Sequence, residues 1–512
     1  MMRSFYSRHK CILNAVILAL LPIIACLIKT LSAGKGICDV YLGAGQWNDE
    51  LFYFKQVEGM VSHKIPMGYF GYNESCASTL SFGAWNPVIL LPWALWGKIF
   101  GWNIMSPIIS NIVYLTIAMF LFGLLAKPGL IETISLSLLL LIITPLARYM
   151  LSGMPEIVCI SLLVVYMGLI LGYETGKKVL RFSLAAIILL ALTIMRPYYA
   201  VFFAFMFFVP KTGEKIAKII SVVLALAGVF VSLKISDIYC APYLSDVYST
   251  DIIANFKNFG FGYGISTLFK EIVHYLGAIA SASAGAFLNK YPIGIYFAAF
   301  MLQVVLLVIL LFAAEKKNRK NVVSMLICDV AMLMAIVLMY SMGDGFRHLL
   351  AFIVAGGVIL SLYSDKKKIT VAACALVYII LFIINGTDAT YFRPYYDYAE
   401  DAPSRAKVET LAGDLAKMEL TAGPSFDNTV CLVLADPKSD FDGSYNTKWQ
   451  YAYGLPKGFG ISYCTFDYVS ENINSLKSKY VYVVTGGTIE KMLPKTSECI
   501  AANDDVSVYK LR

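Results

Sequence analysis

The chain has 512 residues, of which 58% are hydrophobic and only 15% are charged, and its mean hydropathy is +0.68. Soluble domains average roughly 45–50% apolar and about 25% charged residues. The composition therefore excludes a disordered chain, a coiled coil and an ordinary cytosolic enzyme. The net charge of +8 does not indicate nucleic acid as a partner, because membrane proteins carry excess Lys and Arg in their cytoplasmic loops.

The first part of the chain contains apolar runs that are candidates for membrane spans. A span needs about 20 apolar residues, and fewer where it packs inside a bundle. The pair 182–195 and 198–210 is short, and it is either two half-length helices or one broken span, so the predicted count is about 11. The runs lie at 11–29, 106–126, 130–147, 157–173, 182–195, 198–210, 216–236, 293–314, 322–341, 348–363 and 369–385.

Clusters of Lys and Arg predict the orientation of these spans. Every cluster falls on the same side when the spans are threaded in order, and the positive-inside rule makes that side cytoplasmic. The N-terminus is therefore expected in the cytoplasm, and its apolar run is interpreted as an uncleaved first span. The opposite side carries two long external loops, 30–105 and 237–292. In the first loop, 47–60 and 87–100 are predicted to be helices lying in the membrane interface.

The balance of charge changes sign near Asn385. Residues 1–385 hold 29 basic and 17 acidic side chains, whereas residues 386–512 hold 13 basic and 17 acidic ones. We therefore predict an all-α polytopic membrane domain over 1–385 and a small soluble extracytoplasmic α/β domain over 386–512. The tail is expected to contain a helix at 404–419 and strands at 430–436, 480–487 and 506–512.

Neither the glycines of the tail nor the cysteines of the chain form a motif that points to a particular chemistry. Thr485-Gly486-Gly487 is too short for a phosphate-binding loop, so a structural or acceptor-docking role is expected for the tail. No CxxC motif or metal-type spacing occurs. An even number of cysteines on the external side permits disulfides, and free thiols are the equal alternative. These six are Cys38, Cys76, Cys240, Cys431, Cys464 and Cys499.

Four groups of ionisable residues lie at the predicted outer boundary of the membrane, where charge is costly unless it is used or paired. Asp49 and Glu50 begin the first interfacial helix, and Glu156 follows Pro155 at a later outer turn. For these acids the alternative is capping and dipole stabilisation at a helix start. No other charge lies near Arg196 in the sequence, and the alternative for this residue is a snorkelling or structural arginine. Arg347-His348 ends an outer turn, where a pair with Asp344 is the alternative.

Together the four groups predict a functional site at the outer boundary of the membrane. Arg binds phosphate bidentately, and a carboxylate can take a proton from an attacking hydroxyl. This combination of arginines and carboxylates implies a site where a phosphate ester embedded in the membrane meets a polar acceptor on the outer side.

The order of these motifs resembles the GT-C-fold glycosyltransferases, which include the protein O-mannosyltransferases and the bacterial lipid A aminoarabinose transferase. The resemblance covers the first 210 residues well, the later spans loosely and the tail not at all. The second acid is commonly an Asp followed by Pro in that family, whereas here Pro155 precedes Glu156. The matching segments are Trp47-Asn48-Asp49-Glu50, Pro87 to Phe100-Gly101, Met154-Pro155-Glu156, Met195-Arg196-Pro197 and Arg347-His348.

The resemblance implies an inverting transfer of sugar from a polyprenyl-phosphate donor to a glycan, lipid or protein acceptor. Asp49 would deprotonate or orient the acceptor hydroxyl, with assistance from Glu50. Arg196 and Arg347, with His348, would hold the lipid phosphate, and Glu156 would be the second acid. Some members use a divalent metal and others do not, so the resemblance leaves a metal open and implies no other cofactor.

Three other functions compete with this prediction. A transporter or lipid flippase should show inverted repeats and charges near the bilayer midplane. No convincing repeat occurs, and Asp329 and Gln303 are the clearly polar candidates inside the spans. A non-catalytic cell-surface scaffold would explain the tail but not the Arg-Pro and Arg-His positions. A polysaccharide ligase acting on lipid-linked glycans would share the external phosphate site.

Overall fold

The computed structural model describes most of the chain. It covers residues 2–32, 40, 48–63, 73–75, 87–175, 177–208, 215–239, 251–288, 294–313, 315, 318–338, 345–363, 403–421, 425–433, 436 and 448–512. The predicted span 369–385 and the predicted domain boundary at Asn385 lie outside these residues, as do Cys38, Cys76, Cys240 and Asp344.

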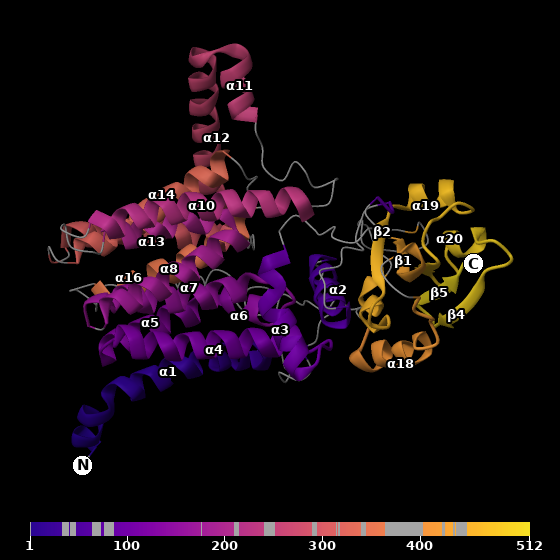
Figure 1. Cartoon of the computed structure of the whole chain (residues 1–512), viewed down its shortest axis with the longest axis horizontal. Helices are drawn as coiled ribbons and strands as arrows, with labels where there is room; N and C mark the ends of the chain where they lie inside the picture. Colours follow the sequence, from indigo (N-terminus) through magenta and orange to yellow (C-terminus); the bar gives the residue numbers. More distant parts are fainter. Residues whose placement is uncertain are drawn as a thin grey trace.

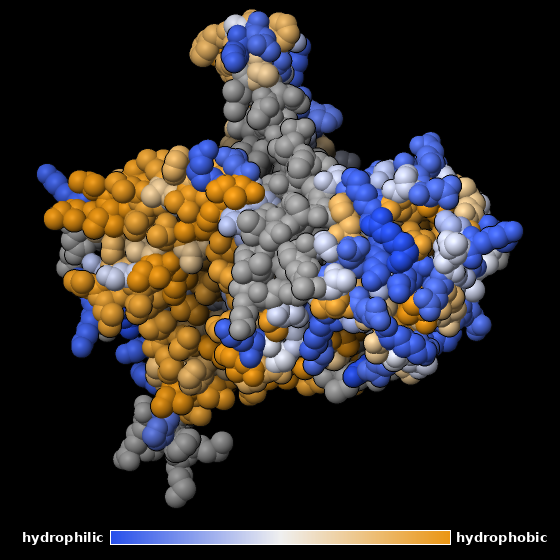
Figure 2. Space-filling model, turned by 45° about the vertical axis from the view of Figure 1, so that its right-hand side comes forward, coloured by the Kyte–Doolittle hydropathy of each residue, from blue (hydrophilic) through white to orange (hydrophobic). Residues whose placement is uncertain are grey.

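A bundle of roughly parallel helices forms the larger part of the molecule (Figure 1). Within the described residues, seven of its helical segments are long and apolar enough to cross a membrane. Large apolar side chains cover the outer surface of the bundle (Figure 2). The chain is therefore a multi-pass membrane protein. The seven segments are α1 (Met2–Ser32), α4 (Ser106–Ala126), α8 (Lys178–Met195), α10 (Lys215–Tyr239), α13 (Gly294–Ala313), α14 (Arg319–Leu338) and the continuous pair η6 (Phe346–His348) and α16 (Leu349–Tyr363).

Three of the other predicted spans form shorter helices. The segment 130–147 divides into α5 (Leu130–Ile142) and α6 (Thr144–Met150), because Pro145 cannot continue a helix. The segment 198–210 forms η4 (Pro197–Phe202) and α9 (Phe203–Phe208). The segment 157–173 forms α7 (Glu156–Leu171), which is followed by η3 (Tyr173–Thr175), and most side chains of α7 are buried. A helix enclosed by its neighbours can be shorter than one that faces lipid along its length.

The two predicted interfacial helices cross one end of the bundle, which we call the site end (Figure 1). They are α2 (Asn48–His63) and, after the short η2 (Pro87–Leu90), α3 (Leu91–Phe100). Trp102, just beyond α3, stacks on Phe54 of α2 and donates an indole hydrogen bond of 3.0 Å to the Phe54 carbonyl. The contact orients α2 across the helix ends.

The second predicted loop, 237–292, contains a helical hairpin that projects sideways from the bundle (Figure 1). It consists of α11 (Asp251–Phe259) and α12 (Phe261–Leu288). The ring of Phe256 packs so closely on Gly264 that a Cβ there would lie 2.4 Å from it. The lack of a side chain at Gly264 therefore lets the two helices pack together.

The C-terminal residues form a small α/β domain beyond the site end. Its five-stranded sheet has the order β2-β1-β3-β5-β4, in which β2, β1 and β3 are parallel and β5 is antiparallel to its neighbours. The bounds are α18 (Arg405–Leu415), η7 (Phe426–Asn428), β1 (Thr429–Val433), η8 (Trp449–Gly454), β2 (Gly460–Cys464), α19 (Phe466–Asn472), β3 (Tyr480–Val484), α20 (Thr488–Met492), β4 (Glu498–Ala502) and β5 (Val506–Lys510).

The predicted fold class is confirmed, and so are the helix and three strands predicted in the tail. Two strands were not predicted. β2 (GISYC) begins with Gly, and β4 (ECIAA) contains Glu and two Ala residues, which are weak strand formers. Cys431 and Cys464 are buried free thiols on neighbouring strands, and Cys499 is an exposed free thiol.

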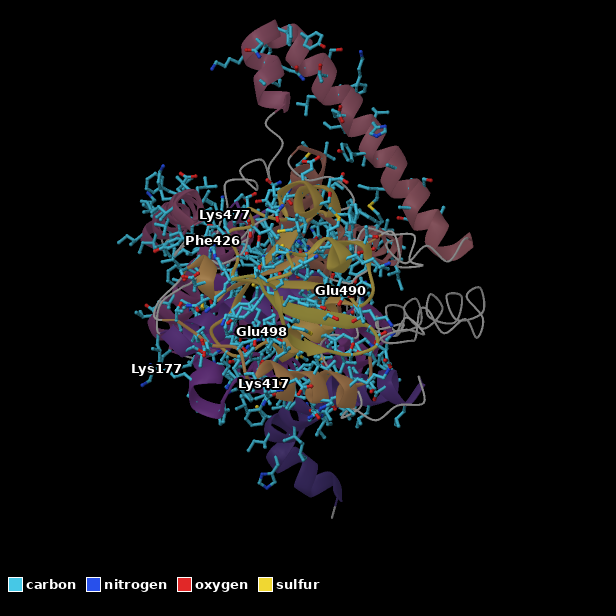
Figure 3. The ribbon with its side chains drawn as sticks, turned by 90° about the vertical axis from the view of Figure 1, so that its right-hand side faces the viewer. Lys177, Lys417, Phe426, Lys477, Glu490 and Glu498 are labelled. Carbon is cyan, nitrogen blue, oxygen red and sulfur yellow. The ribbon has the colours of Figure 1, made fainter. Side chains whose placement is uncertain are left out.

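Charged side chains are spread over the face of this domain that points away from the bundle (Figure 3). They include Lys417 and Glu498, and Lys477, whose ammonium group lies 5.4 Å from the centre of the Phe426 ring. This polar face contrasts with the apolar wall of the bundle.

Candidate functional site

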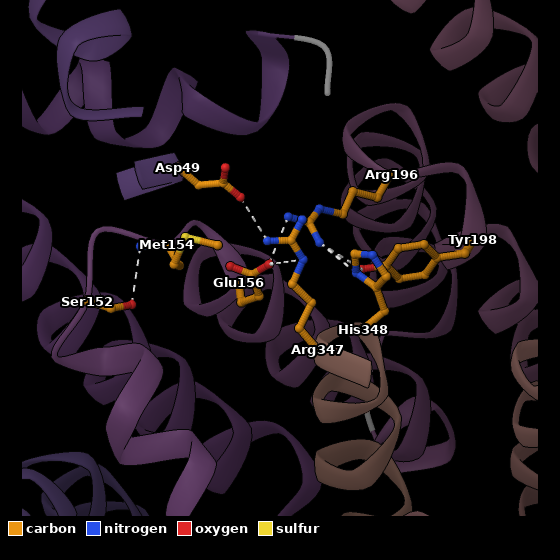
Figure 4. Close-up of polar contacts among 8 residues, drawn as sticks. All are labelled: Asp49, Ser152, Met154, Glu156, Arg196, Tyr198, Arg347 and His348. Atoms are coloured by element: carbon orange, nitrogen blue, oxygen red, sulfur yellow. Dashed lines mark hydrogen bonds and ion pairs between the residues drawn. The ribbon is translucent and has the colours of Figure 1, made fainter. Parts of the chain in front are cut away.

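Five of the six predicted site residues converge at the site end of the bundle (Figure 4). They come from four places in the chain: α2, the start of α7, the end of α8 and η6. We call this group the polar cluster, and its members are Asp49, Glu156, Arg196, Arg347 and His348.

Glu156 is placed by a rigid turn at the start of α7. Pro155 precedes it, so the helix begins at the acid itself. The Asn111 amide of α4 donates hydrogen bonds to the carbonyls of Tyr149 (3.3 Å) and Ser152 (2.9 Å). Trp93 of α3 in turn donates to the Asn111 side-chain oxygen at 3.2 Å. Buried side chains therefore fix the turn that presents Glu156.

Arg196 projects from the end of α8 because Pro197 follows it. A residue before proline is pushed out of the helical region, and Arg196 is extended at φ −148°, ψ 115°. Its side chain is only 1% exposed, and its Nη2 lies 3.0 Å from Glu156 Oε1. The guanidinium lies inside the protein beside a carboxylate, so Arg196 does not snorkel, whereas the structural alternative agrees with this pairing.

His348 and Tyr198 complete the surroundings of Arg196. Arg196 Nη1 lies 2.9 Å from His348 Nδ1 and 3.3 Å from the Tyr198 hydroxyl, which itself lies 3.3 Å from the same His348 nitrogen. A guanidinium can only donate hydrogen bonds. Nδ1 of His348 must therefore be the acceptor, which assigns the ring proton of the neutral imidazole to Nε2.

Arg347 is held more loosely than Arg196. Its Nη1 donates to Asp49 Oδ2 at 3.2 Å, and its Nε lies 4.0 Å from Glu156 Oε1. The Arg347 side chain is 20% exposed and that of Asp49 is 40% exposed. The ion pair between η6 and α2 therefore faces solvent on one side.

The two acids of α2 lie in different surroundings. The helix begins at Asn48, so Asp49 and Glu50 both lie in its first turn, where the helix dipole favours acids. Helix stabilisation and pairing with Arg347 thus coexist at Asp49. Glu50 is completely buried. Burial and the charge of Glu50 raise the pKa of Tyr453 in the C-terminal domain, which places Glu50 on the side of α2 that faces that domain.

Two tyrosines that the sequence analysis did not predict also belong to the site. Tyr198 directly follows Arg196-Pro197 and contacts both Arg196 and His348. Tyr53 lies one turn after Asp49 on α2, and its pKa is raised by burial and by the charge of Asp49. Each tyrosine had a signal in the sequence: Tyr53 is spaced from Asp49 by one helical turn, and Tyr198 is adjacent to the Arg-Pro motif.

The C-terminal domain holds α2 from the side opposite the bundle. Lys55 forms a buried ion pair with Glu58 and donates a hydrogen bond of 3.1 Å to the Leu455 carbonyl. The ring of Phe52 lies 4.7 Å from that of Tyr463 in β2. The helix that carries Asp49 is therefore packed between the bundle and the sheet domain.

A second contact joins the first loop to the same domain. The buried Glu74 carboxylate accepts hydrogen bonds from the backbone N–H groups of Lys477 (2.9 Å) and Ser478 (2.8 Å) and from the Tyr468 hydroxyl (3.0 Å). Asn73 donates its backbone N–H to the Tyr463 carbonyl at 2.9 Å. We call these contacts of Asn73 and Glu74 the loop clasp.

The donor set of the polar cluster does not fit a divalent metal. Both acids that face the cluster, Asp49 and Glu156, are directed at guanidinium groups. Among the residues that the structure describes, no three His, Cys, Asp or Glu side chains lie close enough to hold a metal ion.

The carboxyl ends of the parallel strands in the sheet domain are filled by the protein itself. Asp436 follows β1 and is buried, and its Oδ2 accepts backbone hydrogen bonds from Thr488 (2.9 Å) and Ile489 (3.3 Å). A Cβ at Gly487 would lie 2.6 Å from the same oxygen. The Thr485-Gly486-Gly487 turn thus contacts a carboxylate of its own domain, as a structural turn would.

Comparison with known proteins identifies the fold. No family model matches the chain, and no curated protein does. The crystal structure of ArnT from Cupriavidus metallidurans bound to undecaprenyl phosphate is similar over 96% of this chain and 97% of its own, with 10% sequence identity and a TM-score of 0.50. The chain has the GT-C fold. The apo form of that ArnT covers the same shares at 11% identity, with a TM-score of 0.39.

The match to a GT-C fold includes the C-terminal domain, since it covers 96% of the chain. The predicted resemblance had rested on the first 210 residues and assigned the tail no counterpart. The sheet domain is thus part of the similarity to ArnT, which agrees with its packing against α2.

Proposed function

We propose that the chain is a membrane glycosyltransferase that moves a sugar from a polyprenyl-phosphate donor to a glycan, lipid or protein acceptor. The observation that carries the proposal is the polar cluster at the end of a GT-C bundle. In it a half-exposed carboxylate of an interfacial helix contacts the Arg347 guanidinium, and Glu156 lies between that guanidinium and Arg196. The solved ArnT of that fold is bound to undecaprenyl phosphate. The Lys and Arg distribution predicts that this end lies outside the cytoplasm.

The proposed reaction is a single displacement with inversion. The acceptor oxygen attacks the anomeric carbon, and the bond from that carbon to the phosphate oxygen breaks. The lipid phosphate leaves with the electron pair, and Asp49 takes the acceptor proton. Arg347 binds the phosphate and stabilises the charge that develops on it. Arg196, which is buried and paired, adds positive charge and positions Glu156 and His348.

Transfer from a lipid-linked sugar by the purified full-length chain tests this proposal. Asp49→Asn should lower the transfer rate by about 100-fold or more, because a general base contributes 10²–10⁴-fold. Asp414→Asn on the exposed face of α18 changes the net charge equally and should leave the rate unchanged. Full activity of Asp49→Asn in correctly inserted protein would remove Asp49 as the base.

A transporter or flippase is less well supported by the polar groups inside the bundle. The Gln303 amide donates hydrogen bonds to both oxygens of Asp329 (3.3 and 3.1 Å) and to the Phe352 carbonyl (3.1 Å). These two predicted intramembrane polar residues therefore satisfy each other. Flux of lipid-linked sugar across vesicles without transfer to an acceptor would favour the transporter. A ligase for whole lipid-linked polysaccharides would use the same site, and the length of the transferred glycan distinguishes it.

A further inference from the structure

The two arginines of the polar cluster differ in how readily each guanidinium could leave its carboxylate partner. Arg196 is almost completely buried, and its guanidinium contacts Glu156, His348 and Tyr198. Moving it would leave the buried Glu156 without its closest cation, and a buried charge without a partner is strongly unfavourable. Arg347 is 20% exposed. Its Nε stays near Glu156 at 4.0 Å while its Nη1 contacts Asp49.

The Asp49–Arg347 contact is the exchangeable one. It is a single hydrogen bond of 3.2 Å with a 40% exposed carboxylate, and exposed ion pairs contribute little. A phosphate group offers a guanidinium two parallel hydrogen bonds, which is the geometry that arginine favours. An anionic ligand arriving at the site end can therefore replace the Asp49 carboxylate at Nη1 of Arg347.

The same contact blocks the proposed base. While Asp49 Oδ2 accepts from Arg347, the guanidinium competes with an acceptor hydroxyl for that oxygen. Once a phosphate occupies Arg347, the Asp49 carboxylate is released and both of its oxygens can accept from a hydroxyl.

We propose that Arg347 is exchanged between Asp49 and the phosphate of the donor, so that donor binding releases Asp49 and precedes productive acceptor binding. This inference rests on the proposed function, because it takes a lipid phosphate as the ligand. It assigns the two arginines different tasks: Arg347 is the exchangeable phosphate ligand, and Arg196 is the fixed positioning residue that keeps Glu156 and His348 in place.

Binding of farnesyl phosphate to the purified full-length chain, measured by calorimetry in detergent at fixed pH and salt, tests the exchange. Asp49→Asn and Asp49→Ala should each bind about two- to five-fold more tightly than the unmodified protein, because the competing ion pair is gone. Arg347→Gln should bind at least about tenfold more weakly. The charge-matched control Asp414→Asn should bind as the unmodified protein does. Farnesol, which lacks the phosphate, should not distinguish the variants.

Labelling of the unmodified protein gives a second measurement that needs no variant. Carbodiimide-activated coupling of an amine to Asp49, quantified by mass spectrometry, should rise at least about twofold when farnesyl phosphate is added, because the carboxylate leaves Arg347.

The outcomes separate this inference from the proposed function. Equal or weaker affinity in both Asp49 variants, or labelling that does not rise with ligand, overturns the exchange while leaving a lipid-phosphate site in place. A tighter affinity of the Asp49 variants for farnesol also overturns it, because the gain would not depend on phosphate. Failure of the unmodified protein to bind farnesyl phosphate overturns the proposed donor site itself.

Discussion

Asp49 and Asp436 are aspartates in different parts of the molecule that are stabilised in opposite ways. Asp49 lies at the site end of the bundle, is 40% exposed and contacts a side chain, Arg347. Asp436 lies at the carboxyl ends of the parallel strands, is buried and accepts backbone hydrogen bonds from Thr488 and Ile489. Backbone donors that hold a buried carboxylate cannot turn away from it, whereas an exposed guanidinium can.

The difference shows where chemistry can take place in this fold. Both positions are ones at which ligands commonly bind: the end of a membrane bundle, and the carboxyl edge of a parallel sheet. At the sheet edge the protein supplies its own anion to the backbone donors. At the bundle end the charges are neutralised by other side chains, and one of these pairs, Asp49 with Arg347, is partly exposed. The proposed chemistry therefore fits the bundle end better than the sheet edge, and the sheet domain fits a supporting role.

Of the variants that compare the two regions, the one that removes the acid between the two arginines should lose the most transfer. Glu156→Ala leaves the buried Arg196 without the carboxylate 3.0 Å away, which should cost about 3–5 kcal/mol of stability. In the folded fraction, displacement of the guanidiniums should reduce transfer by about 100-fold. Thermal unfolding and the transfer rate measure the two effects.

Glu409→Ala is the control for Glu156→Ala, because its pair with Arg405 is exposed. That variant should lose at most about 1 kcal/mol and no activity. If Glu156→Ala also lost little stability and no activity, the bundle end would not depend on the buried pair of Glu156 and Arg196. The proposed difference between the bundle end and the sheet domain would then be wrong.

A smaller loss should follow from separating α2 from the sheet domain. Lys55→Met removes the hydrogen bond to the Leu455 carbonyl and leaves Glu58 without the ammonium group beside it. Slight displacement of Asp49 should lower kcat about tenfold with little change in the donor KM, because Arg347 is untouched. Steady-state kinetics separate the two constants.

Burial raises the pKa of Glu58, and the charge of Lys55 opposes that shift. The double variant Lys55→Met with Glu58→Gln should therefore recover stability but not kcat, since the contact with Leu455 is still missing. Recovery of kcat in the double variant would show that the sheet domain does not position the helix.

The smallest effect on transfer is expected at the sheet edge. Asp436→Ala leaves the N–H groups of Thr488 and Ile489 without their acceptor, which should destabilise the C-terminal domain by about 2 kcal/mol. The transfer rate of the folded protein should stay within about twofold of the original, because no step uses Asp436. A tenfold loss of transfer at unchanged stability would place chemistry in the sheet domain after all.

The location of the polar cluster could be predicted from the sequence because membrane topology reduces the problem to two sides. Counts of Lys and Arg elsewhere placed Asp49, Glu156, Arg196 and Arg347 on one side, and the GT-C resemblance suggested their use. The helices at 47–60 and 87–100 followed from their apolar and aromatic patterns, and the structure confirms both.

The pairing within the cluster could not be predicted. Asp49 and Arg347 are 298 residues apart, and Arg196 and Glu156 are 40 residues apart, so no local pattern states which acid meets which base. Burial depends on how α7, α8 and η6 pack, and that packing distinguishes the fixed Arg196 from the accessible Arg347. The sequence reasoning had assigned the two arginines one shared role.

The loop clasp carries a consequence for biogenesis. The Glu74 carboxylate accepts hydrogen bonds from groups that lie about 390 to 400 residues later in the chain, at Tyr468, Lys477 and Ser478. A ribosome therefore makes α2 and its loop about 390 to 400 residues before these partners. A nascent chain can therefore insert every helix of the bundle and still lack the contacts that hold Asp49 in place. The loop clasp can therefore form only after the sheet domain has been made and has folded, so the first loop is fixed later than the bundle helices on either side of it.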